Sequence, residues 1–205
     1  MADRKTVAFF DRQALLWDGY DHAQARERLP GILARAGIGR GEQVLDVGAG
    51  TGILVPFLEA AGVGKMAAVD VSPAMVREYR KKYPGRRIVA ANFGQDRIPF
   101  AAGSFTRILV FNSFPHFHEP ADVFREAFAL LGAGGRLIIC HSMSRTALNK
   151  HHKDAGREVE GDILISDAAI AALYRGAGFV RVVVDDGDHF YSAGDMPAGK
   201  AKRRR

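Results

Sequence analysis

A glycine-rich turn bearing an acidic residue is the segment of this sequence with the clearest chemical potential. Residues 46–52 read Asp-Val-Gly-Ala-Gly-Thr-Gly, directly after the apolar residues Val44 and Leu45. Glycines at such a turn permit positive φ angles and let a ligand approach the backbone closely. A helix that begins there adds exposed N–H groups and the positive end of its dipole. The segment therefore predicts a site for a nucleotide-type ligand.

The spacing of the glycines separates the ligands that such a turn can hold. A dinucleotide site has Gly-x-Gly-x-x-Gly, but here the third glycine comes one residue early and Ile53 holds the sixth place. A phosphate-binding P-loop needs Gly-Lys-Ser/Thr, which this turn lacks. Asp46 suits a ligand with a positive group, and Asp70, at the end of the next apolar run, is placed to bind ribose hydroxyls. Both carboxylates fit S-adenosylmethionine, which has an ammonium, a sulfonium and a nucleoside but no phosphate.

Histidines gather in the second half of the chain, where a methyl acceptor would bind. Methyl transfer from a sulfonium needs alignment and exclusion of water, and it needs a base only if the acceptor must lose a proton. We expect His116 to be that base, with Asn112 and His141 at the reacting centre. The residues expected to contact the acceptor are His118, His151, His152 and Arg157.

A metal site is the alternative interpretation of the same cluster. Imidazole nitrogens bind zinc, nickel, copper and iron, and carboxylates lie nearby in the sequence. The spacing matches no known zinc pattern, so we expect no resident metal. The residues that could form such a site are His116, His141, His151 or His152 with Asp154, Glu158 or Asp162.

Short apolar runs alternate with helical patterns along the chain, which is typical of a doubly wound, mostly parallel sheet with helices on both faces. We expect Pro30 to kink or divide the second helix. The predicted strands are 43–47, 65–70, 87–91, 106–111, 136–140, 180–184 and 189–193, the last two forming a hairpin. The predicted helices are 11–17, 22–36, 54–61, 73–82, 121–131, 146–152 and 167–175.

The length and composition indicate one globular domain. The chain has 205 residues, 47% of them hydrophobic, and a domain averages roughly 150 residues. We expect one domain over 1–195, with helices in 1–38 over the donor site and an insertion or lid at 141–165 over the acceptor site. No apolar run is long enough for a membrane span, and the N-terminus has no signal-peptide pattern. A single cysteine, Cys140, cannot form an internal disulfide, which is typical of a reducing cytosol.

The net charge of +6 comes mostly from the C-terminus. Five positive charges lie within 200–205, so the rest of the chain is close to neutral. Residues 196–205 therefore form a basic tail, which could contact nucleic acid or anionic lipid.

Five motifs in order make the sequence resemble the class I S-adenosylmethionine-dependent methyltransferases. Within them it is similar to the type 11 group, which includes the ubiquinone and menaquinone methyltransferases. Asn92 stands where the family usually has Asp, and an amide can still accept a hydrogen bond; Ala133 stands where the family usually has Pro. The matching segments are 46–52, 69–73, 91–93 with 98–100, 105–112 and 131–137.

The resemblance implies a seven-stranded sheet in the order 3-2-1-4-5-7-6, with the seventh strand antiparallel. It also implies methyl transfer from S-adenosylmethionine to a small molecule, with S-adenosylhomocysteine as product. Asp46 would contact the methionine end and Asp70 the ribose, while Asn92 and Phe93 would flank the adenine. The residues expected to bind the cofactor are Asp46, Gly48, Ala49, Gly50, Gly52, Asp70, Val71, Asn92, Phe93 and Asn112.

Two other functions remain open from the sequence. One is methylation of RNA or another nucleic acid through the basic tail and the insertion, although no Asn-Pro-Pro-Tyr-type motif follows the fourth strand. The other is a non-catalytic binder of S-adenosylmethionine, in which the histidines sense a metal or a corrinoid.

Overall fold

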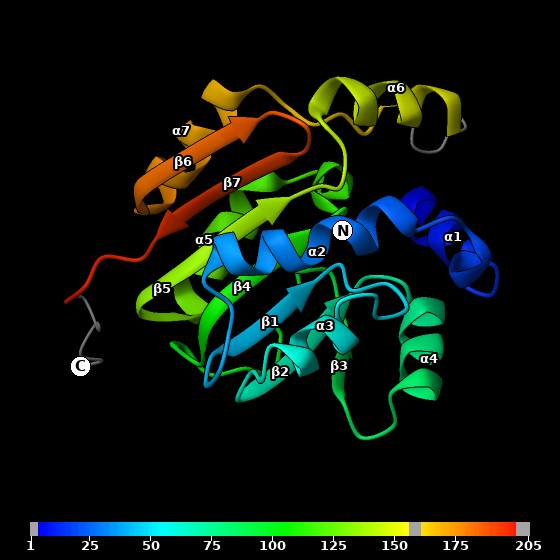
Figure 1. The fold of residues 1–205 in the computed structure, drawn as a ribbon, viewed down its shortest axis with the longest axis horizontal. Coiled ribbons are helices and arrows are strands. Elements are labelled where there is room, and N and C mark those ends of the chain that lie inside the picture. Colours follow the sequence, from blue (N-terminus) through cyan, green and yellow to red (C-terminus); the bar gives the residue numbers. More distant parts are fainter. Residues whose placement is uncertain (1–3, 156–160, 200–205) are drawn as a thin grey trace.

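A seven-stranded sheet organises the chain (Figure 1), in a computed structural model that describes residues 4–155 and 161–199. Its strand order is β3-β2-β1-β4-β5-β7-β6, and β7 runs antiparallel to both of its neighbours. The predicted topology and the hairpin of the last two strands are confirmed. The strands are β1 (Gln43–Val47), β2 (Lys65–Asp70), β3 (Arg87–Ala90), β4 (Phe105–Phe111), β5 (Leu131–Cys140), β6 (Val180–Asp186) and β7 (Phe190–Asp195).

Alternate residues of the central strands enter two separate cores, as expected for a sheet covered on both faces. In β4, Ile108 and Val110 face one core while Leu109 and Phe111 face the other. The first core packs under α5 and α7, and the second under α2 and α3. The helices are α1 (Arg4–Gln13), η1 (Trp17–Gly19), α2 (Ala23–Ala36), α3 (Val55–Ala60), α4 (Pro73–Lys82), η2 (Phe114–His116), α5 (Pro120–Leu130), α6 (Arg145–Ala155) and α7 (Asp167–Ala177).

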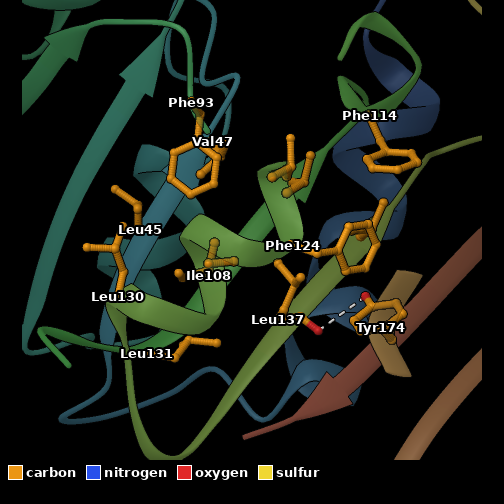
Figure 2. Packing of buried hydrophobic residues seen from close by; sticks show 14 of the residues in the cluster. Leu45, Val47, Phe93, Ile108, Phe114, Phe124, Leu130, Leu131, Leu137 and Tyr174 are labelled. Carbon is orange, nitrogen blue, oxygen red and sulfur yellow. Dashed lines mark hydrogen bonds between the residues drawn. The ribbon is translucent and has the colours of Figure 1, made fainter. Parts of the chain in front are cut away.

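Tyr174 of α7 fixes the second half of the sheet against α5. Its ring lies edge-on to Phe124, with 4.7 Å between the ring centroids. Its hydroxyl donates a hydrogen bond to the carbonyl oxygen of Leu137 (Figure 2), over 3.4 Å. A buried tyrosine needs such a partner for its hydroxyl, so this contact positions α7 on β5.

The predicted bounds of the first helix are wrong, and of the two effects predicted for Pro30, a kink or a division of the helix, the division does not occur. The first helix spans 4–13 rather than 11–17, because Phe10 packs with Ala74 and Met75 at the start of α4 and this contact stabilises the earlier turns. Pro30 lies inside α2 without dividing it. Leu29 and Leu33 are buried on either side of Pro30, and their packing holds the helix together across the missing hydrogen bond.

The carboxyl ends of the parallel strands meet where α1 and α6 also lie. Both helices are at the end of the sheet toward which the arrowheads of β1, β4 and β5 point (Figure 1). Loops at this end are the usual ligand site of an open α/β sheet. Over the described residues, none of the helices has the length and apolarity needed to cross a membrane.

Candidate functional site

A cavity of about 160 Å³ opens at the carboxyl ends of β1, β2 and β4. Its walls are the loops at 48–51, 69–71, 91–93, 111–113 and 116–119. The N-terminal region closes it from outside with Thr6, Val7, Phe10, Trp17, Asp18, His22 and Arg26. The cavity therefore combines the segments that the sequence predicts for the donor and part of those predicted for the acceptor.

The three glycines of the turn after β1, Gly48, Gly50 and Gly52, have different structural roles. Gly48 has φ +72°, and a Cβ there would lie 2.5 Å from the Cβ of Ser113. Gly50, with φ +55°, lies against the indole nitrogen of Trp17. Gly48 and Gly50 line the cavity, but Gly52 does not. A Cβ at Gly52 would meet the rings of Tyr79 in α4 and of Tyr83, the residue directly after it, so Gly52 lets α4 pack closely.

Asp70 lies at the end of β2, on the cavity wall, and is held by backbone donors. The Gly50 N–H donates to Oδ2 over 2.7 Å, and the Ser72 N–H donates to Oδ1 over 2.9 Å. Burial raises the pKa of Asp70 to about 6, while these two N–H groups act in the opposite direction. The carboxylate is thus fixed in position, facing the space where a ligand would lie.

Asp46 is buried one layer behind the cavity. Its side chain is not part of the cavity wall, and only 4% of the residue is exposed. Burial, together with the repulsion from Asp70, raises the pKa of Asp46 to about 8. A cationic group bound nearby would relieve the repulsion between these two carboxylates.

The remaining predicted cofactor residues lie together on the wall. Ala49, Val71, Asn92 and Phe93 all line the cavity. The Asn92 N–H donates to Oδ2 of Asp96 over 2.8 Å, which forms the turn after β3. The Asn92 side chain belongs to the same wall as Asp70 and Phe93.

Two acidic residues that sequence reasoning missed attach the N-terminal region to the cavity. Asp11 of α1 accepts hydrogen bonds from the Ser72 hydroxyl, over 2.6 Å, and from the Ala74 N–H, over 3.0 Å. Asp11 therefore caps α4 from a different helix. Such a long-range cap leaves no local pattern in the sequence.

The second of these residues, Asp18, anchors η1. It accepts a hydrogen bond from the Thr51 hydroxyl over 2.6 Å, and it forms an ion pair with Lys82 over 2.8 Å. These partners come from the glycine turn and from the end of α4. Asp18 thus holds Trp17, its neighbour in η1, against Gly50.

Asn112 lines the cavity, but its side-chain amide is used in hydrogen bonds that stabilise the fold. Its backbone has φ 53°, which Asn tolerates better than most residues. Its side chain accepts from the Ser142 N–H over 2.7 Å and donates to the Ser142 hydroxyl over 3.1 Å. Asn112 therefore joins the ends of β4 and β5.

Of the histidines predicted for the acceptor side, His116 and His118 line the cavity. Nδ1 of His116 lies 2.7 Å from Oδ2 of Asp162. Nε2 of His118 lies 3.2 Å from the Thr6 hydroxyl of α1. The pair of His116 and Asp162 joins residues 46 positions apart in the sequence, which the sequence alone could not show.

Three further histidines, predicted for the reacting centre (His141) or for the acceptor (His151 and His152), do not line the cavity. His141 is buried with neither ring nitrogen hydrogen-bonded, and burial lowers its pKa to about 3. His152 is buried behind His116, and His151 is exposed on α6. Arg157 lies outside the described residues. Among the residues that are described, no three His, Cys, Asp or Glu side chains are arranged to hold a metal.

Comparison with known proteins finds methyltransferases, both as the matching family model and among the similar relatives. The family model described as "Methyltransferase domain" matches residues 45–139. The erythromycin 3''-O-methyltransferase of Saccharopolyspora erythraea is 33% identical over 128 residues, covering 57% of this chain and 40% of the relative. The demethylmenaquinone methyltransferase of Tropheryma whipplei is 30% identical over 104 residues, covering 51% of this chain and 43% of the relative.

Solved structures share the fold over nearly the whole chain. An S-adenosylmethionine-dependent methyltransferase of Thermotoga maritima superposes with a TM-score of 0.73 at 18% identity, covering 93% of this chain and 99% of that one. By contrast, the chain spans less than half the length of the two curated relatives named above.

Proposed function

We propose that the chain is a class I S-adenosylmethionine-dependent methyltransferase, as the matching family model and the similar relatives suggest, and that it methylates a small-molecule acceptor in the cavity at the end of its sheet. The observation that best supports this proposal is the position of Asp70. This residue is a buried carboxylate at the end of β2, fixed by two backbone N–H groups and exposed to the cavity. In doubly wound folds a carboxylate at this position binds ribose hydroxyls.

The residues around Asp70 fit the rest of the cofactor. Asn92 and Phe93 form the wall where the adenine would lie, and Gly48 and Gly50 leave room for the methionine end. Asp46, buried beside Asp70, would favour the α-ammonium group. The turn carries no Gly-Lys-Ser/Thr sequence for a phosphate, so this donor set favours a cationic nucleoside over a pyrophosphate.

When bound, the cofactor would supply an already activated methyl group on a sulfonium. The task of the chain is to align the acceptor with that methyl and to exclude water. The rings of Phe10 and Trp17, 5.7 Å apart, cover the cavity from the N-terminal side. Aromatic faces attract a sulfonium by cation–π contact, and the same rings exclude solvent.

His116 is the base in this proposal. It lines the cavity, and Nδ1 is already occupied by Asp162, so Nε2 is the ring nitrogen left to take a proton from the acceptor. His118 contributes to the same side of the cavity. Asn112 acts by holding the ends of β4 and β5 in place.

The cavity volume supports a small acceptor over a nucleic acid. About 160 Å³ lies beneath α1 and η1, and outside 200–205 the chain is close to neutral. Phosphate contacts dominate nucleic-acid affinity and need clustered Lys and Arg. The nucleic-acid alternative predicts RNA binding that weakens steeply as salt rises, and binding that is absent or independent of salt would remove it.

A calorimetric titration with S-adenosylhomocysteine tests the donor site. We expect micromolar binding by the wild type and at least about a tenfold loss in Asp70→Asn, because the amide donates where the carboxylate accepts. Asp195→Asn is the matched control. Asp195 is also a buried carboxylate, but its partners are Arg136 and Arg181, away from the cavity.

The outcomes separate the competing interpretations. Loss of binding in both variants would indicate a general structural effect, and no binding by the wild type would refute the donor site. Wild-type binding without methyl transfer to any compound in an acceptor screen would favour the non-catalytic binder.

A further inference from the structure

Asp162 lies in the connection between α6 and α7, far from the donor motifs, yet its carboxylate meets the cavity histidine. Its Oδ2 is 2.7 Å from Nδ1 of His116, and its side chain is 7% exposed. A buried carboxylate is costly unless it is paired. The sole side-chain partner recorded for it among the described residues is His116.

We propose that Asp162 is a positioning residue, which holds His116 as the Nδ1–H tautomer and so keeps Nε2 free to accept a proton from a hydroxyl acceptor. This inference rests on the proposed function of the cavity. A carboxylate accepts but cannot donate, so a neutral His116 paired with it must carry its proton on Nδ1. The second nitrogen is then unprotonated on a ring that lines the cavity.

The segment that carries Asp162 is itself held in place. Nδ1 of His152 hydrogen-bonds the carbonyl oxygen of Asp162. Asn149 accepts from the Leu164 N–H over 2.8 Å and donates to the Leu164 carbonyl oxygen over 3.3 Å. α6 therefore fixes the backbone at Asp162 and at Leu164, two residues later, which limits the directions that the carboxylate can take.

Two imidazoles, an aromatic ring and two carboxylates face His116 from the elements packed around it. Burial lowers the pKa of His141 and of His152, so both neighbouring imidazoles are neutral near pH 7. The Phe10 ring lies edge-on to His116, 5.0 Å away, and excludes water from that side. Asp162 and, more weakly, Asp70 are the negative charges that face it.

These contacts define the class of acceptor. An acceptor that is already an anion, such as a thiolate, or a neutral amine attacks without a base, whereas a neutral hydroxyl must lose its proton as it reacts. The acceptor O–H bond breaks and its proton goes to Nε2 of His116. When bound, the cofactor would supply the methyl carbon to an electron pair of that oxygen, and the pair of its broken C–S bond would stay on sulfur. The imidazolium, stabilised by Asp162, then releases its proton to water.

Nitrogen NMR of protein labelled at its histidines tests the tautomer without any acceptor. At a pH well above the ordinary histidine pKa of about 6.5, we expect wild-type His116 to show a protonated Nδ1 and an unprotonated Nε2. We expect Asp162→Ala to move the proton to Nε2, the nitrogen that neutral histidine prefers without a partner. An Nε2–H tautomer in the wild type, or no change in the variant, would overturn the proposal.

Asn149→Ala is the matched control for a merely structural role. It loosens the same connection at Leu164 but leaves the carboxylate beside His116. We expect its His116 tautomer to match the wild type. If it changes as in Asp162→Ala, the effect comes from the connection, and Asp162 has no specific role.

Methyl transfer to phenol and to thiophenol from radiolabelled S-adenosylmethionine tests the acceptor class. At about pH 8 phenol is un-ionised, whereas thiophenol is ionised. We expect Asp162→Ala to lower turnover of phenol by about 100-fold and that of thiophenol by less than about threefold. Equal losses for both compounds, or wild-type turnover of thiophenol alone, would refute the hydroxyl acceptor. S-adenosylhomocysteine binding, measured in the same samples, reports separately on the proposed donor site.

Discussion

The substitution Gly48→Ala tests whether the turn after β1 needs glycine for its backbone, for its contacts, or for both. Gly48 has φ +72°, and a Cβ there would lie 2.4 Å from the hydroxyl oxygen and 2.5 Å from the Cβ of Ser113. Gly62 has nearly the same φ, +70°, but a Cβ there would meet nothing within 4 Å. The two positions therefore separate the cost of conformation from the cost of crowding.

The structure gives a magnitude for each cost. A left-handed conformation costs an alanine about 1–2 kcal/mol, so we expect Gly62→Ala to lower the free energy of unfolding by about 1 kcal/mol. Gly48→Ala adds crowding, worth about 1–3 kcal/mol. It also adds the loss of the Ser113 hydrogen bond to the Val47 carbonyl, worth about 1 kcal/mol. We expect a total of about 3–5 kcal/mol.

Urea unfolding of a double-mutant cycle provides the assay. Ser113→Gly removes both atoms that crowd Gly48. The double variant Gly48→Ala/Ser113→Gly should therefore be more stable, by about 2 kcal/mol, than the sum of the single changes predicts. Additive single effects, or a Gly48→Ala variant no less stable than Gly62→Ala, would refute the reasoning.

Three further predictions concern the carboxylates and the N-terminal region. Burial raises the pKa of Asp46 to about 8. The folded chain therefore keeps a proton on this carboxyl that the unfolded chain releases above about pH 4. As a result, the free energy of unfolding that this group contributes falls as the pH rises up to and through 8. Asp46→Asn should therefore raise the melting temperature over the wild type more at pH 8 than at pH 5, and an equal gain at both would contradict the pKa shift. Asp11→Ala removes the bonds from Ser72 and Ala74 and should cost about 1–2 kcal/mol, with faster hydrogen exchange in α1; unchanged exchange there would show that α1 does not depend on this cap. Trp17 is the single tryptophan and lines the cavity, so its fluorescence should change when S-adenosylhomocysteine binds, and a constant emission at saturating ligand would place the ligand elsewhere.

The elements with a strong local pattern could be predicted closely from the sequence. β1, β2 and α4 match the predicted bounds, because apolar runs and the Ser72 cap with Pro73 mark them locally. The order of the strands in the sheet could be predicted as well, but only from the resemblance of the motifs to a known family. The glycine turn was also predictable, but the distinct role of Gly52 depends on Tyr79 and Tyr83, whose rings pack on it.

The parts that could not be predicted depend on contacts between distant segments. Asp11 and Asp162 carry no local motif, and their importance comes from partners 61 and 46 positions away. Among the histidines, the sequence could not separate His116, on the cavity wall, from His141, buried behind it. Both follow a strand, and the direction of a side chain after a strand depends on the loop, not on the residue type.

Apart from the N-terminal residues that close it from outside, the cavity wall consists of two sets of residues that are separate along the chain. The segments at 48–51, 69–71 and 91–93 come from the first half of the sheet, and those at 111–113 and 116–119, with Asp162 behind them, come from the second. A recombination or insertion downstream of β4 can therefore replace one set while leaving the other unaltered. Such a layout lets descendants of one gene acquire new chemistry by exchanging a contiguous stretch of coding sequence, without rebuilding the part of the fold that they share.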